Sequence, residues 1–176
     1  MTDDRQQAAS FERVPSEQMR TAFRHLVSGV VVITCWVDDR PWGLTVNSCS
    51  SISVDPSRVV VSLQTHTRTC TAVLADQRFG MVMLGAHQQE VAEVAATPGQ
   101  PKFLDDYCEP RDGNRPPVIS HAIWNLQCDV HRVIDIGDHC LIVADVTALV
   151  EAAASAGKPE PLLYFNRTYR LIGGHP

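Results

Sequence analysis

"GLTVNSCSSISV", residues 43–54, decides how the rest of the sequence is interpreted, because it has strand-forming residues but no charge. A strand whose outer face meets water usually carries Lys, Glu or Arg there. Here the polar positions hold only short neutral groups: Thr45, Asn47, Ser48, Ser50, Ser51 and Ser53. The simple alternative is an ordinary sheet surface, on which Ser and Thr are common. The stretch equally suits a strand edge that hydrogen-bonds an uncharged polar ligand.

Strand patterns on both sides of this segment predict a mainly β protein with a few helices (α+β). The expected strands cover 31–37, 42–48, 51–54, 58–64, 78–84, 122–135 and 139–150, with short strands inside 161–172. Helical spacing and end signals predict helices over 16–28, 69–77 and 87–96, and residues 97–117 are expected to form a long surface loop. Because strands and helices do not alternate regularly, an antiparallel barrel is favoured over a doubly wound sheet.

The domain boundaries follow from composition. Residues 1–14 are expected to form a flexible N-terminal tail, and residues 15–173 a single domain. The "AAASAGKPE" stretch at 152–160 is expected to be a flexible connector.

Charge and hydropathy remove several classes of function. A net charge of −5 argues against a nucleic-acid partner, which normally meets a basic face. No apolar stretch reaches the roughly 20 residues that a membrane helix needs, and the polar start does not resemble a signal peptide. A cytoplasmic protein is therefore expected. Its six cysteines form no C-x-x-C pair and are expected to be small buried hydrophobic residues.

The usual catalytic and metal-binding motifs are absent. No metal site is expected, because Cys128 and His131 would lie on opposite faces of a strand. A chain without a nucleophile–base pair can still be an enzyme if an organic cofactor carries the chemistry. Residues 62–74 run from a strand end into a helix start through Thr65, Thr67, Arg68 and Thr69, which is typical of a phosphate site. The alternative is that a threonine there only caps the helix.

Several stretches together resemble the short-chain flavin reductase family, the reductase components of two-component flavin-dependent monooxygenases. They are "FRHLVSGVVVIT", "GLTVNSCSSISVDPS", "VVVSLQTHTRTCTAVLADQRFGMVML", "KF" at 102–103, "GDH" at 137–139 and "PLLYFNRTYRL". The resemblance implies a six-stranded antiparallel Greek-key split barrel of the FMN-binding type. It also implies a homodimer with the flavin near the subunit interface.

The resemblance also implies roles for particular residues. Thr45, Val46, Asn47 and Ser48 would line the flavin ring and ribityl chain, with Ser62, Leu63 and Gln64 beside them. Thr67, Arg68 and Thr69 would bind the phosphate, and Phe103 would bound the site. Gly137 and Asp138 would form a turn with His139, the one candidate catalytic residue, which is associated with the nicotinamide dinucleotide. A turn histidine that only bonds its neighbours is the alternative for His139.

The expected function is that of an NAD(P)H:flavin oxidoreductase. It would pass hydride from NADH or NADPH to FMN or FAD and supply reduced flavin to a separate monooxygenase. Two alternatives stay open on the same barrel. One is an oxidase or reductase that keeps its flavin and acts directly on an organic substrate, and the other is a non-catalytic flavin or haem carrier.

Overall fold

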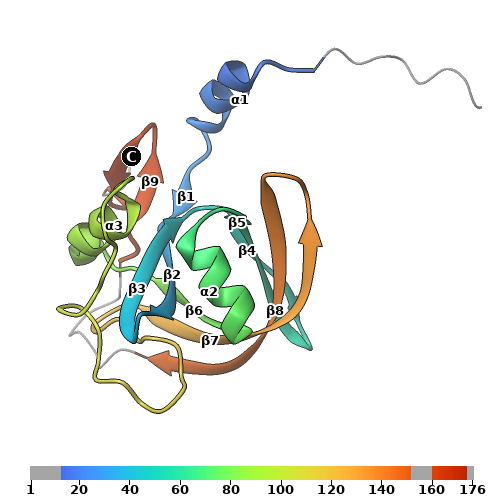
Figure 1. The fold of residues 1–176 in the computed structure, drawn as a ribbon. Coiled ribbons are helices and arrows are strands. Elements are labelled where there is room, and N and C mark those ends of the chain that lie inside the picture. Colours follow the sequence, from blue (N-terminus) through green and yellow to red (C-terminus); the bar gives the residue numbers. More distant parts are fainter. Residues whose placement is uncertain (1–12, 152–159, 174–176) are drawn as a thin grey trace, which may run out of the picture.

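A curved antiparallel sheet of seven strands dominates the computed structural model, which describes residues 13–151 and 160–173 (Figure 1). The strands are β2 (Val31–Val37), β3 (Arg40–Val46), β4 (Cys49–Val54), β5 (Ser57–Gln64), β6 (Arg78–Met83), β7 (Trp124–Asp135) and β8 (His139–Glu151). They pair in the order β3-β2-β6-β7-β8-β5-β4. The mainly β fold with a few helices is confirmed.

The strand count of six that the resemblance implies is wrong for this sheet, whereas the seven strand patterns between residues 31 and 150 match its seven strands. Residues 40–54 supply two strands: β3 pairs with β2 at one edge, and β4 pairs with β5 at the other. The break falls at Asn47 and Ser48, in the middle of the uncharged stretch. A second, three-stranded sheet combines β1 (Ser28–Gly29), β9 (Leu163–Phe165) and β10 (Thr168–Arg170) in the order β1-β9-β10.

The helices lie near their expected positions, with one clear difference. They are α1 (Ser16–Phe23), α2 (Arg68–Asp76) and α3 (Gln89–Ala96), the last preceded by the short 3-10 helix η1 (Ala86–Gln88). The first helix ends at Phe23 rather than near residue 28, and Pro15 rather than Ser16 is its N-cap. Because α1 buries none of its side chains, no packing extends it beyond two turns.

Two hydrophobic clusters cover the two faces of strands β2 and β6. Ile33 and Met81 belong to a cluster that α2 covers, whereas Val32 and Val82 face a second cluster against α3. Successive residues of a strand point to opposite faces, so burial on both faces requires the continuous apolar run "VVITCWV". Figure 1 shows α2 inside the curve of the sheet and α3 on its outer side.

The long loop after α3 packs against the sheet instead of running freely over the surface. Leu104 is fully buried, and Thr34 of β2 donates a 2.7 Å hydrogen bond to the carbonyl of Pro117. Trp36 likewise donates to the carbonyl of Arg115 at 2.7 Å. The loop therefore covers the outer face of the first hairpin, which its proline content alone did not reveal.

The predicted N-terminal tail and connector lie largely outside the residues that the structure describes. Residues 1–12 and 152–159 lie outside the described residues, so the tail over 1–14 and the connector over 152–160 stay predictions. The single domain over 15–173 also stays a prediction. No helix of the described chain has the length and apolar character needed to cross a membrane.

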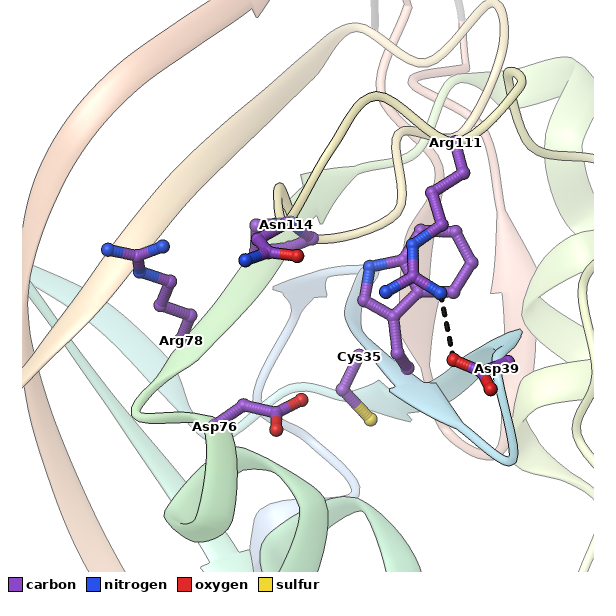
Figure 2. A pocket seen from close by; sticks show the side chains of 8 residues that line it. Cys35, Asp39, Asp76, Arg78, Arg111 and Asn114 are labelled. Carbon is purple, nitrogen blue, oxygen red and sulfur yellow. Dashed lines mark hydrogen bonds and ion pairs between the residues drawn. The ribbon is translucent and has the colours of Figure 1, made fainter.

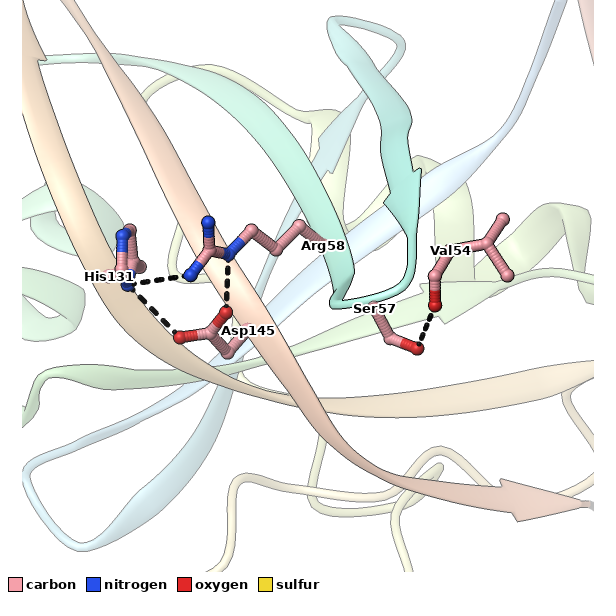
Figure 3. A network of polar contacts seen from close by, with 5 residues as sticks. All are labelled: Val54, Ser57, Arg58, His131 and Asp145. Carbon is pink, nitrogen blue, oxygen red and sulfur yellow. Dashed lines mark hydrogen bonds and ion pairs between the residues drawn. The ribbon is translucent and has the colours of Figure 1, made fainter.

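An ion network ties three neighbouring strands together on the sheet surface (Figure 3). Arg58 of β5 donates from Nε to Oδ1 of Asp145 on β8 at 2.6 Å. His131 of β7 places Nδ1 3.1 Å from the other carboxylate oxygen. The hydrogen bond from Arg58 is the main reason that the pKa of Asp145 lies below its ordinary value, with smaller contributions from the charges of Arg58 and His131.

We expect Asp145→Asn to lower the melting temperature at pH 7 by a few degrees. Because the folded-state pKa is depressed, the stabilisation is present above the ordinary carboxyl pKa of about 3.9. It is lost as the pH falls through the lower, folded-state value. Thermal unfolding at a series of pH values checks this, with Asp106→Asn as the control, since Asp106 forms no ion pair within the described residues. A difference that persists unchanged at pH 2 would contradict the assignment.

Candidate functional site

The uncharged stretch meets strand β5 directly after the break between β3 and β4. The hydroxyl of Ser48 donates to the carbonyl of Ser62 at 2.9 Å, and the Ser62 N–H donates back to the Ser48 carbonyl at 2.9 Å. Ser48 is exposed and Ser62 is half-buried. Two of the predicted flavin-binding segments are therefore held side by side at this edge of the sheet.

The next turn along β5 is tied to the turn between β7 and β8. Gln64 pairs with His139 across the two strands. Thr65 donates from both its N–H (3.0 Å) and its hydroxyl (3.2 Å) to the carbonyl of Asp138. Gly137 has a φ of 96°, a backbone conformation that side chains other than glycine rarely adopt, so glycine allows this sharp bend. The structure thus joins the "GDH" turn to the start of the threonine-rich segment.

His139 has one ring nitrogen engaged and one left over. Its Nδ1 lies 2.8 Å from the carboxylate of Asp138, whose side chain is 84% exposed. The hydrogen bond to His139 holds the pKa of Asp138 below its usual value, with the histidine charge adding to the effect. An ionised carboxylate only accepts hydrogen bonds, so the proton sits on Nδ1 and Nε2 is left for other partners. The ring is about one-third exposed, so a ligand can reach it.

The threonines of the predicted phosphate turn are mainly structural. Thr67 caps α2: its hydroxyl accepts from the N–H of Cys70 at 3.2 Å and donates to the Gln64 carbonyl at 2.8 Å. Thr69 is buried and accepts from the indole N–H of Trp42 at 3.1 Å. Arg68 is exposed and pairs with Asp38 at 3.3 Å. The first N–H groups of the nine-residue helix α2 are what this turn offers to an anion.

Contacts within the protein also occupy the side chains of Thr45, Val46 and Leu63. The hydroxyl of Thr45 donates to the carbonyl of Ala92 on α3 at 2.7 Å. Val46 packs against the hydrophobic cluster under α2, and Leu63 is 1% exposed within it. Any contact that Leu63 makes with a ligand must therefore come from its main chain.

Two exposed amide side chains, in contrast, are not occupied by such contacts. Neither Asn47 nor Gln64 has a side-chain hydrogen bond to any residue in 13–151 or 160–173. Asn47 lines two neighbouring pockets, of about 200 Å³ and about 250 Å³, and shares both with Tyr164. An amide both donates and accepts, so these two side chains can bond a polar ring of either character. Asn47 belongs to the uncharged stretch, and Gln64 is one of the residues that the resemblance implied.

Phe103 packs against Trp42, and its predicted role in bounding the site stays a prediction. Its ring packs edge-on against that of Trp42 with centroids 5.0 Å apart, and the guanidinium of Arg40 lies 3.8 Å from its centroid. Trp42 in turn holds the hydroxyl of Thr69. The aromatic pair therefore supports the start of α2 from behind.

A larger pocket of about 370 Å³ lies at the opposite end of α2 (Figure 2). It is lined by Asp76, the last residue of that helix, and by other charged residues that include two paired arginines. Arg111 pairs with Asp39 and Arg78 with Asp129, each at 3.0 Å. Both arginines of this pocket are paired, Arg111 with an aspartate of the lining and Arg78 with one outside it, and none of the predicted site residues lines the pocket.

The cysteines behave as buried hydrophobic residues. Four are buried and two are half-buried, and all six are free thiols. Cys70 and Cys140 have sulfur atoms 3.5 Å apart beneath the start of α2. Within the described chain, no three His, Cys, Asp or Glu side chains gather in a way that could hold a metal ion.

Sequence reasoning missed some residues that the structure brings to this edge. Thr65 was noted among the threonines but not included in the predicted site, although it makes both hydrogen bonds to Asp138. Tyr164 was missed because nothing in a short strand near the C-terminus indicates which segment it will face. Only the pairing of β9 with β1 and β10 brings it beside Asn47.

Comparison with known proteins identifies the class to which this fold and site belong. The flavin reductase like domain model matches residues 23–173, so the chain belongs to that family. It is an oxidoreductase of the flavin reductase class. The reductase component of 4-nitrophenol 4-monooxygenase/4-nitrocatechol 2-monooxygenase from Rhodococcus opacus is 30% identical over 159 residues, covering 90% of this chain and 83% of that protein.

Two further proteins show the same likeness. The NADH:riboflavin 5'-phosphate oxidoreductase of Streptomyces pristinaespiralis is 31% identical, over 89% of this chain and 88% of its own. Nitrilotriacetate monooxygenase component B from Mycobacterium thermoresistibile superposes with a TM-score of 0.78 at 27% identity, covering 92% of this chain and 90% of that chain.

Proposed function

We propose that the protein is an NAD(P)H:flavin oxidoreductase that passes reduced flavin to a separate monooxygenase. The observation that carries the proposal is the family match over residues 23–173. This part of the chain includes the "GDH" turn at 137–139 and the turn after β5, which are joined by a hydrogen bond from Thr65 to Asp138. FMN or FAD would be the flavin, and NADH, the donor named for several relatives, the preferred hydride source over NADPH. The finer fold assignment, an FMN-binding split barrel with Greek-key topology, belongs to the same proposal.

The donor set at the sheet edge fits a flavin. Most of the hydroxyl protons there are used within the protein: Thr45 donates to Ala92, Ser48 to Ser62 and Thr67 to Gln64. These oxygens can therefore only accept further hydrogen bonds. The amides of Asn47 and Gln64 supply neutral donors and acceptors for the carbonyls and nitrogens of the ring. The N–H groups at the start of α2 suit the phosphate.

The residues of the two joined turns then have distinct roles. The flavin, when bound, supplies the ring that takes hydride from the reduced nicotinamide. Asp138 orients the imidazole of His139 so that Nε2 can hold the dinucleotide close to the flavin edge. Thr65 fixes this turn relative to the phosphate turn, so both ligands meet in a set geometry. Main-chain and amide N–H groups stabilise the charge that develops on the reduced ring.

We expect Asn47→Ala to raise the dissociation constant of the flavin about five- to tenfold, because one direct hydrogen bond is lost. Quenching of flavin fluorescence measures this. Ser50→Ala is the matched control, since the Ser50 hydroxyl bonds only the neighbouring Ser51 carbonyl at 3.1 Å. Equal affinities for Asn47→Ala and the parent would remove Asn47 from the site.

The experiment that tests the function mixes the purified protein with NADH or NADPH and either FMN or FAD. The absorbance of the reduced dinucleotide should fall, with many flavin molecules reduced per protein. No loss of absorbance with any of the four pairs would overturn the proposal. Reduction of only one tightly held flavin per protein would favour an enzyme that acts directly on an organic substrate. Binding without reduction would favour a carrier.

We also propose that the protein is a cytoplasmic homodimer. The apolar side chains of Ile52 and Val54 on the edge strand β4 are more than half exposed. A second copy of the chain would cover such a surface. Sedimentation should then give twice the chain mass of 19.4 kDa at micromolar concentration. A monomer mass would contradict the proposal.

A further inference from the structure

Three arginines surround one pocket at the edge of the candidate flavin site. Arg20 of α1, Arg24 just after it and Arg167 in the turn between β9 and β10 line a cavity of about 250 Å³. Asn47 and Tyr164 line the same cavity and also the neighbouring one, where they are joined by Thr45 and Val46. The pocket is therefore continuous with the segment proposed to hold the flavin.

The walls of this three-arginine pocket are tied to each other by the fold. The N–H of Asn166 in the β9–β10 turn donates to the carbonyl of Arg24 at 3.0 Å. The ring of His25 lies 6.4 Å from that of Phe165 in an edge-on arrangement. The end of the first helix and the turn of the C-terminal hairpin thus lie side by side, although they are far apart in the sequence.

Among the described residues, the three guanidinium groups have no partner of opposite charge. Six other arginines of the chain form ion pairs with aspartates: Arg40, Arg58, Arg68, Arg78, Arg111 and Arg115. Within residues 13–151 and 160–173, no carboxylate pairs with Arg20, Arg24 or Arg167. The Nε of Arg24 is buried and has no hydrogen-bond partner there. The guanidinium charge of Arg24 is therefore not compensated by these residues, and an anion in the pocket would neutralise it.

The backbone of Arg167 is a second, independent observation. Asn166 and Arg167 have φ values of 47° and 64°, in the left-handed region. A two-residue hairpin turn of this kind favours Asn followed by Gly, because a side chain at the second position is strained. The chain keeps an arginine where glycine would fold more easily. Strain retained beside a pocket indicates that the side chain has a function there.

We propose that this pocket binds the adenosine diphosphate group of a dinucleotide. Guanidinium forks bind phosphate oxygens in pairs, and the two phosphates carry the charge that three arginines would neutralise. The rings of Phe23 and Tyr164 offer aromatic walls for the base. This inference rests on the proposed function, since FAD and NADH both contain this group while FMN lacks it.

The test compares the parent with Arg167→Gly and with the double variant Arg20→Gln/Arg24→Gln. Arg167→Gly relieves the backbone strain, so its melting temperature should equal or exceed that of the parent and any loss of binding is not misfolding. Arg170→Gln is the matched control, because Arg170 lies on the same hairpin and lines neither pocket. Calorimetry measures the affinity for ADP, and fluorescence quenching measures the affinities for FAD and FMN.

We expect the affinity for ADP to fall at least tenfold in both arginine variants, with FMN binding and the control unchanged. A parallel loss for FAD identifies the flavin as the source of the group. A rise in the KM for NADH with FMN as the acceptor identifies the nicotinamide donor instead. Parent-like affinity for ADP in the variants, no ADP binding by the parent, or an equal loss of FMN affinity would each overturn the inference. Failure of the proposed function is distinct, because the parent would then oxidise no dinucleotide even if it bound ADP.

Discussion

His139→Ala should lower kcat/KM for NADH about ten- to hundredfold while the affinity for FMN stays close to that of the parent. The imidazole is the group whose free nitrogen can contact the dinucleotide, and losing a hydrogen bond to a charged or polar ligand costs about 1.5–3 kcal/mol. The backbone pairing of residue 139 with Gln64 does not depend on the side chain, so the flavin edge should keep its shape. Steady-state kinetics and a flavin titration measure the two quantities.

The control for this prediction is His87→Ala, an exposed histidine of η1 on another part of the chain. It should leave both quantities unchanged. His139→Gln adds a second comparison, because the amide oxygen of glutamine can accept a hydrogen bond in place of the ring Nε2 and should restore part of the loss. If His139→Ala kept full kcat/KM, His139 would be only a turn residue that bonds Asp138. If flavin binding fell as far as kcat/KM, its role would be to shape the flavin site.

Gly80→Ala should destabilise the fold by about 3 kcal/mol, near the upper end of the usual cost of overpacking a core. A Cβ at this position would lie 2.1 Å from the hydroxyl oxygen of Thr34 and 3.2 Å from the carbonyl of Pro117. Thr34 cannot move away cheaply, because it is fully buried and its hydroxyl donates to that same carbonyl. The substitution would therefore disturb both the β2–β6 pairing and the contact of the long loop.

Urea unfolding of the two proteins measures this difference. Gly29→Ala is the matched control, since nothing lies within 4 Å of the Cβ it would add. We expect the control to change the free energy of unfolding by less than about 0.5 kcal/mol. A Gly80→Ala protein as stable as the parent would show that the loop shifts freely and does not fix the sheet.

Most elements of the fold could be predicted from local patterns. The β-branched run at 31–37 indicated a strand, and a threonine at 67 or 69 indicated the start of the helix that begins at Arg68. The contact between Ser48 and Ser62 follows once β4, which begins just after Ser48, pairs with β5, which contains Ser62. These features depend on residues that are close in sequence or on regular strand periodicity.

The hydrogen-bond partners of the hydroxyl groups could not be predicted from such local patterns. Thr45 bonds a helix carbonyl 47 residues away, and Thr69 bonds an indole 27 residues away. Only tertiary packing brings these partners together. As a result, several hydroxyl groups that were predicted to bind a ligand instead form hydrogen bonds within the protein. The three-arginine pocket was missed for the same reason, because its walls come from the two ends of the chain.

The burial of the thiols affects how readily the cysteines are oxidised when dioxygen is present. Free reduced flavin reacts with dioxygen and yields hydrogen peroxide, which attacks cysteine in its thiolate form. Burial raises the pKa of Cys35 and Cys128 to about 12, and it is also the main cause that raises that of Cys70 to about 11. At pH 7 a thiol with a pKa of about 12 is ionised to only about one part in 100,000, against a few per cent for an ordinary cysteine. The thiols of these three cysteines are therefore protected from the peroxide that forms when reduced flavin meets dioxygen.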